Sequence, residues 1–295
     1  MTGTFEALAR HIGAAVGMRL QPSPAQRIHG GSISTACRWN GNAGPLFVKI
    51  APAAERGMLE AEAEGLLELK RAQAVRVPEV LAVGADDGHA WLALEWIEFG
   101  PASTAAETEL GRRLALQHRR CARAFGWHRD NTIGRTPQAN HPTQDWLAFV
   151  RERRLRPQID RAHPYITGRL RERCSLLLER LGDLLGAHRP CPSLVHGDLW
   201  GGNWGVDAHG DPVVFDPAVY YGDREVDLAM TRLFGGFGPA FYRAYAAEWP
   251  LEAGADARAD LYNLYHVLNH LNLFGAGYLP QVRSLLERVL AETGH

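Results

Sequence analysis

Hydrophobic side chains along the first hundred residues follow two different spacings. Phe5, Leu8, Ile12 and Val16 recur every three or four positions, which predicts a short amphipathic helix over residues 4–17. Beyond this helix the spacing falls to two, which is typical of strands. The pattern predicts strands at 33–39, 46–50, 77–83 and 91–97 and a helix at 54–72. Two hairpins separated by a helix predict a small antiparallel sheet with one helix packed on it.

The rest of the chain is mainly helical in its pattern. Helical spacing recurs over residues 104–124, 144–161, 165–187, 224–233, 239–247, 256–274 and 280–292. Two short apolar strands are expected between these helices, at 194–195 and 213–215. We therefore predict an α+β fold of two lobes, with residues 1–98 in a sheet-containing lobe and residues 99–295 in a helical lobe.

Composition narrows the partners that the protein is expected to have. Hydrophobic residues make up 46% of the 295 residues, charged residues 22%, and the formal net charge is −1. This balance gives no general attraction to nucleic acid or to an anionic membrane. No apolar run is long enough to span a membrane, and the N-terminus does not resemble a signal peptide. We expect a cytoplasmic protein, either a monomer or a homodimer, with neither a nucleic-acid nor a membrane partner.

The four cysteines are scattered along the chain. They are Cys37, Cys121, Cys174 and Cys191, and none forms a Cys-x-x-Cys motif. Neither a zinc site nor a disulfide framework is indicated by this spacing. We expect free thiols in a reducing compartment.

Lysine is rare in this chain, and one of its two lysines lies in a predicted strand. Only Lys49 and Lys70 are lysines among the 32 basic residues. Lys49 follows Phe47 and Val48 in an apolar strand, where an ammonium group needs a partner if it is buried. Glu62 lies on the stripe of the helix 54–72 that is predicted to face the sheet, and we expect it to pair with Lys49. The alternative is a solvent-exposed lysine on an edge strand.

Two acidic loops carry the strongest chemical signal. The apolar strand at 194–195 leads into His196, Gly197 and Asp198, and Asn203 follows five residues after the aspartate. A second apolar strand ends at Asp216, and a hairpin through 207–211 is expected to bring the two loops together. An aspartate that accepts a hydroxyl proton, an asparagine and a second aspartate that bind Mg²⁺ form the arrangement used in phosphoryl transfer.

The same interpretation assigns the other parts of a nucleotide site. Gly30, Gly31 and Ser32 open the first hairpin, where backbone N–H groups can approach phosphates. Residues from Glu95 to Ile97 are expected to form the hinge that meets adenine. We therefore predict ATP and Mg²⁺ as cofactors, with Lys49 and Glu62 at the nucleotide, Asn203 and Asp216 at the metal, and Asp198 as the catalytic base.

Sequence features near Asp198 favour a small acceptor over a protein kinase substrate. The residue immediately before Asp198 is a glycine, whereas protein kinases have an arginine there. No long activation loop follows Asp216. Trp200 is expected either to stack on a sugar or to pack on a helix, and Glu225 and His266 are further candidates for substrate contact. Glu225 has the alternative of a structural pair with Arg224. Asp227 is expected to cap a helix or to bind the backbone of the catalytic loop.

Several segments resemble the fructosamine kinase (ketosamine-3-kinase) family. The resemblance is carried by residues 216–230, by 196–200 with Asn203, by 62–66, by 130–134 with Gln138 and Asn140, and by 264–275. It covers nearly the whole chain. It implies an aminoglycoside-phosphotransferase-like, protein-kinase-like fold and ATP-dependent phosphorylation of the 3-hydroxyl of ribulosamines or fructosamines, free or bound to protein. The phosphorylated adduct is unstable and releases the amine, so the resemblance also implies a role in deglycation.

One residue departs from the family pattern, and other functions stay open. Many family members place a cysteine linked to redox control in the glycine-rich loop, where this chain has Ser32. We therefore expect no redox switching at that position. A kinase for an aminoglycoside, choline or homoserine is the first alternative, and a pseudokinase that only binds nucleotide is the second.

Overall fold

A five-stranded antiparallel sheet forms one end of the molecule. The computed structural model describes residues 2–28, 34–86 and 88–293. The strand order is β1-β2-β3-β5-β4. The bounds are Gln26–Ile28 for β1, Thr35–Gly41 for β2, Gly44–Pro52 for β3, Val80–Ala85 for β4 and His89–Glu95 for β5. Lys49 lies opposite Ala36 on one side and Leu92 on the other, so it is held in the centre of the sheet.

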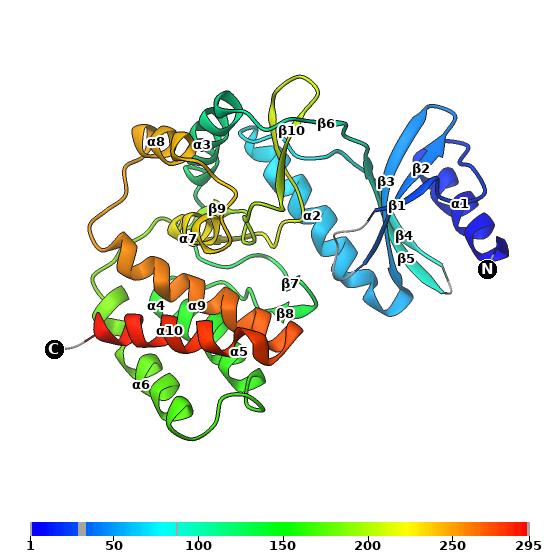
Figure 1. Cartoon of the computed structure of the whole chain (residues 1–295). Coiled ribbons are helices and arrows are strands. Elements are labelled where there is room, and N and C mark those ends of the chain that lie inside the picture. The colour runs from blue at the N-terminus through cyan, green and yellow to red at the C-terminus, as the bar shows by residue number, and fades with distance from the viewer. Residues whose placement is uncertain (1, 29–33, 87, 294–295) are drawn as a thin grey trace.

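Two helices cover the two faces of this sheet. Helix α1 (Thr2–Val16) packs on the outer face, where Leu8 and Ile12 join a core with Trp39 and Trp91. Helix α2 (Arg56–Ala72) follows a short 3₁₀ turn (Ala53–Glu55) and packs on the inner face. In Figure 1 α2 lies between the sheet and the helical part of the molecule. Glu62 is therefore carried to the boundary between these two parts.

The remaining chain is built mainly of helices around one continuous core. Their bounds are Thr104–His118 for α3, Trp146–Phe149 for α4, Arg156–Arg161 for α5, Gly168–Leu185 for α6, Glu225–Leu233 for α7, Pro239–Glu248 for α8, Ala255–Phe274 for α9 and Leu279–Ala291 for α10. A π-helical turn (Val150–Leu155) joins α4 to α5, and a 3₁₀ turn (Ala276–Tyr278) precedes α10. Helix α9 packs against both α7 and α10 (Figure 1).

Short strands hold the loops of this helical part together. Strand β10 (Trp204–Asp207) pairs with β11 (Pro212–Val214) and with β6 (Phe99–Gly100). Strand β9 (Ser193–Val195) pairs with β12 (Tyr220–Gly222), and β7 (Asn131–Ile133) pairs with β8 (Thr136–Gln138). The predicted hairpin through 207–211 is thus confirmed, because β10 and β11 flank it.

Most predicted elements are present, with shifts at their ends. The helix expected at 104–124 ends at His118, and the single helix expected at 144–161 is divided by the π-helical turn. The strand expected at 77–83 runs over Val80–Ala85. Strands β1, β6, β7, β8, β10 and β12 have only two to four residues each and are not predicted by the hydrophobic pattern. No helix within the described ranges is both long and apolar enough to cross a membrane.

The expectation of four free thiols is wrong. Cys121 and Cys191 form a disulfide across 70 residues, with their Cα atoms 6.2 Å apart. Cys121 follows α3 and forms an isolated backbone β-bridge with Ser193, so the disulfide links the chain after α3 to the segment before β9. Cys37 and Cys174 are free and buried. The spacing of the cysteines does not indicate this pairing, because the two residues become neighbours only when these distant segments align.

Candidate active site

Strand β9 delivers the loop that carries Asp198. Between strand and aspartate the chain turns at Gly197, whose φ of +81° lies in the left-handed region. A Cβ at this position would lie 2.2 Å from the carbonyl oxygen of Ala218. Glycine is therefore required here for both backbone conformation and space. The turn brings Asp198 beside the segment that follows Asp216.

Asp227, in the first turn of α7, holds this loop from behind. Its carboxylate accepts hydrogen bonds from the backbone N–H groups of His196 at 2.7 Å and Gly197 at 2.8 Å. A third contact joins it to Nε2 of His118 at 3.0 Å. Burial raises the pKa of Asp227, but these partners outweigh it and leave the pKa below its ordinary value. The expectation that Asp227 binds the catalytic-loop backbone is confirmed.

Asn203 lies against Asp198 and links it to the second acidic loop. Its Nδ2 donates to the backbone oxygen of Asp198 at 2.9 Å and approaches the carboxylate at 3.3 Å. The same nitrogen is 3.5 Å from the backbone oxygen of Asp216. Burial and the nearby charge of Asp216 raise the pKa of Asp198 to about 7, although the hydrogen bond from Asn203 acts in the opposite direction. Asp198 therefore holds a proton more strongly than an ordinary aspartate does.

Lys49 joins the sheet to the second acidic loop. Its Nζ donates to Oδ1 of Asp216 at 2.6 Å and to Oε1 of Glu62 at 2.7 Å. Burial lowers the pKa of Lys49, but the two carboxylates more than compensate and hold the pKa above its ordinary value. Burial also raises the pKa of Glu62. The predicted pair of Lys49 and Glu62 is present, and the alternative of an exposed lysine is excluded.

Asp216 adopts an unusual backbone conformation. Its φ is +58°, and apart from Gln73 no other non-glycine residue in the described ranges has a positive φ. Left-handed conformations cost a non-glycine residue of the order of 1 kcal/mol and collect at functional sites. The conformation leaves the side chain 41% exposed while one oxygen contacts Lys49. The other carboxylate oxygen is open to a ligand.

A buried chain of amides supports the segment after Asp216. Asn131 donates to the carbonyl oxygen of Val219 at 2.8 Å, and Gln138 donates to that of Ala218 at 3.2 Å. Nδ2 of Asn140 and Nε2 of Gln138 both donate to Oδ1 of Asn131. These residues lie on or beside the hairpin β7–β8. Their amides therefore hold the second acidic loop through its backbone.

Arg154 orients this chain of amides. Its guanidinium donates to Oδ1 of Asn140 at 2.7 Å and to the carbonyl oxygen of Ala139 at 2.6 Å, and it lies 4.1 Å from the ring centroid of Tyr220. It is 3% exposed. The arginine-rich stretch 151–173, in which acidic residues alternate with arginines, is typical of a solvated helical face, but Arg154 is buried. The π-helical turn that carries Arg154 points it inward, which helical spacing does not reveal.

Other predicted nucleotide residues lie at the edge of the sheet or outside the described ranges. Glu95 ends β5, and its carboxylate binds Arg76 at 2.6 Å. Arg76 also binds Asp207 at 3.0 Å, so it connects β5 to β10. Ile97 follows, and no backbone hydrogen bond joins it to another residue within the described ranges. Gly30, Gly31 and Ser32 lie outside those ranges.

Two of the three substrate candidates differ sharply in exposure. Trp200 is 38% exposed and contacts Phe234, in the loop after α7, with ring centroids 6.3 Å apart. Phe234 is the C-terminal cap residue of α7, so this ring contact lies at the end of a helix. His266 is 1% exposed, and neither ring nitrogen has a hydrogen-bond partner among the described residues. Burial lowers the pKa of His266 to about 3, so it is neutral.

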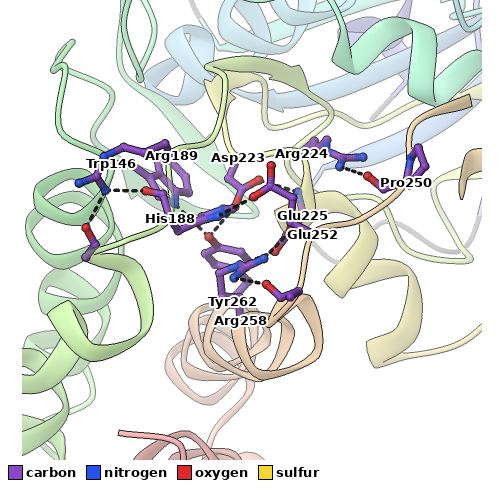
Figure 2. Close-up of polar contacts among 12 residues, drawn as sticks. Trp146, His188, Arg189, Asp223, Arg224, Glu225, Pro250, Glu252, Arg258 and Tyr262 are labelled. Carbon is purple, nitrogen blue, oxygen red and sulfur yellow. Dashed lines mark hydrogen bonds and ion pairs between the residues drawn. The ribbon is translucent and has the colours of Figure 1, made fainter. Parts of the chain in front are cut away.

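The third candidate, Glu225, lies in a buried charged cluster. Both of its carboxylate oxygens bind Arg258, at 2.7 and 2.9 Å. Figure 2 shows this pair beside Asp223, which binds His188 and Tyr262 at 2.7 Å each. The structural alternative therefore describes Glu225, although its partner is Arg258 and not Arg224. Arg258 thus donates one hydrogen bond to each carboxylate oxygen of Glu225, and the residue is 3% exposed.

Comparison with known proteins gives one consistent family. The family model described as fructosamine kinase matches residues 4–292. A Synechocystis protein named as a probable ketoamine kinase is 42% identical over 288 residues, which are 97% of each chain. The chloroplastic protein-ribulosamine 3-kinase of Arabidopsis thaliana is 39% identical over 89% of this chain and 81% of its own.

Solved structures agree on the fold. A crystal structure from Haemophilus somnus, described as a fructosamine-3-kinase, has a TM-score of 0.89 at 26% identity and covers 98% of this chain and 99% of its own. The structure of the streptomycin–ATP–APH(2″)-IIa ternary complex has a TM-score of 0.61 at 16% identity and covers 96% of this chain and 95% of its own. At this identity the similarity shows the fold alone. The predicted α+β, protein-kinase-like fold is confirmed.

Proposed function

Because this chain belongs to the fructosamine kinase family, we propose that it transfers the γ-phosphoryl group of ATP to the 3-hydroxyl of ketosamines. The names of its relatives, ketoamine kinase and protein-ribulosamine 3-kinase, support this acceptor. One observation carries the proposal. Nδ2 of Asn203 lies 3.3 Å from the carboxylate of Asp198 and 3.5 Å from the backbone oxygen of Asp216, and Lys49 binds Asp216 at 2.6 Å, so residues of three separate segments meet at one place.

Asp198 is the proposed base for the acceptor hydroxyl. A general base works best when its pKa is near the working pH, and Asp198 has a pKa of about 7 before any cation binds. The amide of Asn203 fixes the direction of its carboxylate. Trp200 lies two residues further on and offers an exposed ring that a sugar could stack on.

The nucleotide is proposed to bind between the sheet and Asp216. Lys49, positioned by Glu62, would move its ammonium from Asp216 to the phosphates. Gly30, Gly31 and Ser32, which lie outside the described residues, are proposed to contact the phosphates. Glu95 ends β5, which pairs with β3 on one side and β4 on the other. The backbone N–H and C=O groups of Ile97, just beyond, bond to no other backbone group among the described residues and are proposed to meet adenine. The lobes proposed at 1–98 and 99–295 would meet along this line.

Asp216 and Asn203 fit a magnesium ion. Mg²⁺ prefers carboxylate and amide oxygens. One carboxylate oxygen of Asp216 has no partner among the described residues, and Oδ1 of Asn203 is likewise free because Nδ2 makes the contacts to Asp198. When bound there, Mg²⁺ would neutralise charge on the transferred phosphate. Lys49 supplies further positive charge from the other side.

The biological consequence proposed is removal of sugar from amines. After enolisation of the ketosamine between C1 and C2, the 3-phosphate leaves as inorganic phosphate and an imine forms at C1. Water then hydrolyses this imine, which frees the amine and a 3-deoxyosone sugar. We propose that the substrate is a free or protein-bound ketosamine and that the enzyme acts in the cytoplasm, where ATP is supplied. A monomer or a homodimer is compatible with this function.

The first prediction tests the base. Asp198→Asn keeps the size of the side chain and removes its proton acceptor, so kcat with a ribulosamine should fall by about 10²–10⁴-fold while ATP still binds. ADP release with ribulosamine, fructosamine, aminoglycoside, choline or no acceptor measures both activity and specificity. Turnover by Asp198→Asn near that of the unmodified protein would refute the role of Asp198. Turnover by the unmodified protein with an aminoglycoside alone would refute the acceptor class.

A further inference from the structure

A short segment of the helical part, residues 128–131, contacts both sides of the candidate active site. Arg129 forms an ion pair with α2, and Asn131 donates to the carbonyl oxygen of Val219, in the segment that follows the second acidic loop. Figure 1 shows β7, which begins at Asn131, beside α2. We call residues 128–131 the tether, because neighbouring residues of one short segment bind both α2 and the second acidic loop.

The tether binds α2 at two points. Nη1 of Arg129 lies 2.5 Å from Oε1 of Glu64, and Nη2 donates to the carbonyl oxygen of Gly57, in the first turn of α2, at 3.3 Å. Nε2 of His128 lies 2.9 Å from the other carboxylate oxygen of Glu64. Burial raises the pKa of Glu64, but its bonds to His128 and Arg129 outweigh burial and hold the pKa below its ordinary value. Glu64 is therefore ionised at neutral pH and anchors the tether through its charge.

A second set of contacts closes this arrangement into a ring. Gly65 packs directly on Val219, since a Cβ added to Gly65 would lie 3.2 Å from Cγ2 of Val219. Val219 is the residue whose carbonyl oxygen accepts from Asn131 of the tether. The hydroxyl of Tyr221 donates to Oε1 of Glu68, one turn beyond Glu64 on α2, at 2.7 Å. The tether, α2 and the segment that carries Val219 therefore hold one another in pairs.

This ring connects the two carboxylates that bind Lys49. Glu62 lies two residues before Glu64 and so on the opposite side of α2, and Asp216 lies three residues before Val219. Lys49 donates to Glu62 at 2.7 Å and to Asp216 at 2.6 Å. When the ammonium turns to the phosphates of ATP, as proposed above, this direct link between the two carboxylates is lost. The position of Glu62 relative to Asp216 then depends on the ring of contacts.

We propose that Arg129 is a positioning residue for phosphoryl transfer, which holds α2 through Glu64 and so places Lys49 for the transferred phosphate. The inference rests on the proposed function and adds a residue to it. Among the described residues Arg129 bonds only to Glu64 and to backbone oxygens, so it acts through α2 and not on the reacting groups. A small displacement of a phosphate-binding group is enough to lower the rate of transfer, because the reaction depends on alignment.

The test removes the charge of Arg129 and measures each kinetic constant separately. The ion pair is partly exposed, at 29% for Arg129 and 41% for Glu64, and such a pair contributes up to about 1 kcal/mol, or about fivefold in rate. In Arg129→Gln, kcat for ADP release with ATP, Mg²⁺ and a ribulosamine should fall about fivefold, while the KM for ATP changes by less than about twofold. The melting temperature should stay within about 3 °C of that of the unmodified protein.

A matched control distinguishes the tether from a general loss of positive charge. Arg123, six residues before Arg129, is exposed and forms no ion pair within the described ranges. Arg123→Gln should therefore leave kcat and the KM for ATP unchanged. Arg129→Lys keeps a charge within reach of Glu64 and should restore kcat to within about twofold of the unmodified protein.

A double-mutant cycle shows whether Arg129 acts through Glu64. Glu64→Gln alone should lower kcat about as much as Arg129→Gln does, and the double variant should be no slower than Glu64→Gln. Two independent structural effects would instead multiply, to about 25-fold in the double variant.

Each outcome decides the inference. It is overturned if Arg129→Gln keeps the kcat of the unmodified protein, if only the KM for ATP changes, or if the two single losses multiply in the double variant. Phosphorylation of the ribulosamine by the unmodified protein leaves the proposed function in place in all three cases. If the unmodified protein phosphorylates no ribulosamine, the proposed function and the inference fail together.

Discussion

Replacing Asp227 is expected to release the catalytic loop from its support. The carboxylate is fully buried and receives two backbone N–H groups of the loop and one ring nitrogen of His118. In Asp227→Asn one of the two oxygens becomes an NH₂ group that would face a donor. At least one buried donor is then left without an acceptor, and the side chain keeps nearly the same volume.

The magnitude follows from these contacts. Hydrogen bonds to a charged group contribute about 1.5–3 kcal/mol each, and removing one partner of a buried charged pair costs about 3–5 kcal/mol. We therefore expect Asp227→Asn to lower the free energy of unfolding by about 3 kcal/mol. Asp227 touches no reacting atom and acts by positioning His196 and Gly197. A displacement of the loop by about 1 Å would lower kcat on the order of 10²-fold, with a smaller effect on the KM for ATP.

Urea denaturation measures the stability change, and initial rates of ADP release measure kcat. The pKa of Asp227 is lowered in the folded protein, so its stabilisation is present above the unfolded pKa of about 3.9 and is lost as the pH falls through the folded value. The difference between the two proteins should be constant from about pH 6 to 8 and shrink in acid. Asp183→Asn, an exposed change on α6, is the control. Equal stability of Asp227→Asn and the unmodified protein at pH 7 would refute the reasoning.

Two further predictions concern features that hold the helical part together. Arg154→Lys should lower the free energy of unfolding by about 2–4 kcal/mol, because a lysine cannot bind Ala139 and Asn140 together while stacking on Tyr220. The control Arg153→Lys should change the free energy of unfolding by less than about 0.5 kcal/mol in the same urea titration. Denatured protein should show two reactive thiols without reductant and four after reduction. Reduction should also lower the melting temperature by on the order of 10 °C, because a crosslink across 70 residues contributes about 4 kcal/mol to stability. Four thiols before reduction would contradict the disulfide.

The sequence predicted those features that depend on local pattern or on single residues of strong character. Helices α1, α2, α6 and α9 have long apolar stripes, and all four are present near their expected bounds. Lys49 could be paired with Glu62 because a charge in an apolar strand needs a partner and the helix offers few inward-facing carboxylates. Asp227 could be assigned to the loop backbone because helix starts favour acidic side chains near N–H groups.

What the sequence did not predict depends on contacts between distant segments. Strands β7 and β8 have three residues each, and their place is defined by Asn131 and Gln138 bonding to the chain some 80–88 residues later. Arg154 belongs to an arginine-rich stretch whose composition is typical of a solvated face, yet it is 3% exposed. Glu225 was left with two alternatives because its partner Arg258 lies 33 residues away on α9. A pattern along the chain contains no information on which of these polar groups meet.

The two acidic loops are held by their backbones, and this leaves their side chains free for chemistry. Asp227 binds the N–H groups before Asp198, and the amides of Asn131 and Gln138 bind the carbonyl groups after Asp216. Within the described ranges the carboxylate of Asp198 contacts only Asn203, and that of Asp216 contacts only Lys49. The nucleotide and the cation proposed for this site would replace these two contacts without disturbing the support behind them. The strained φ of Asp216 persists for the same reason, because rigid hydrogen bonds on the following segment leave the residue little freedom to relax.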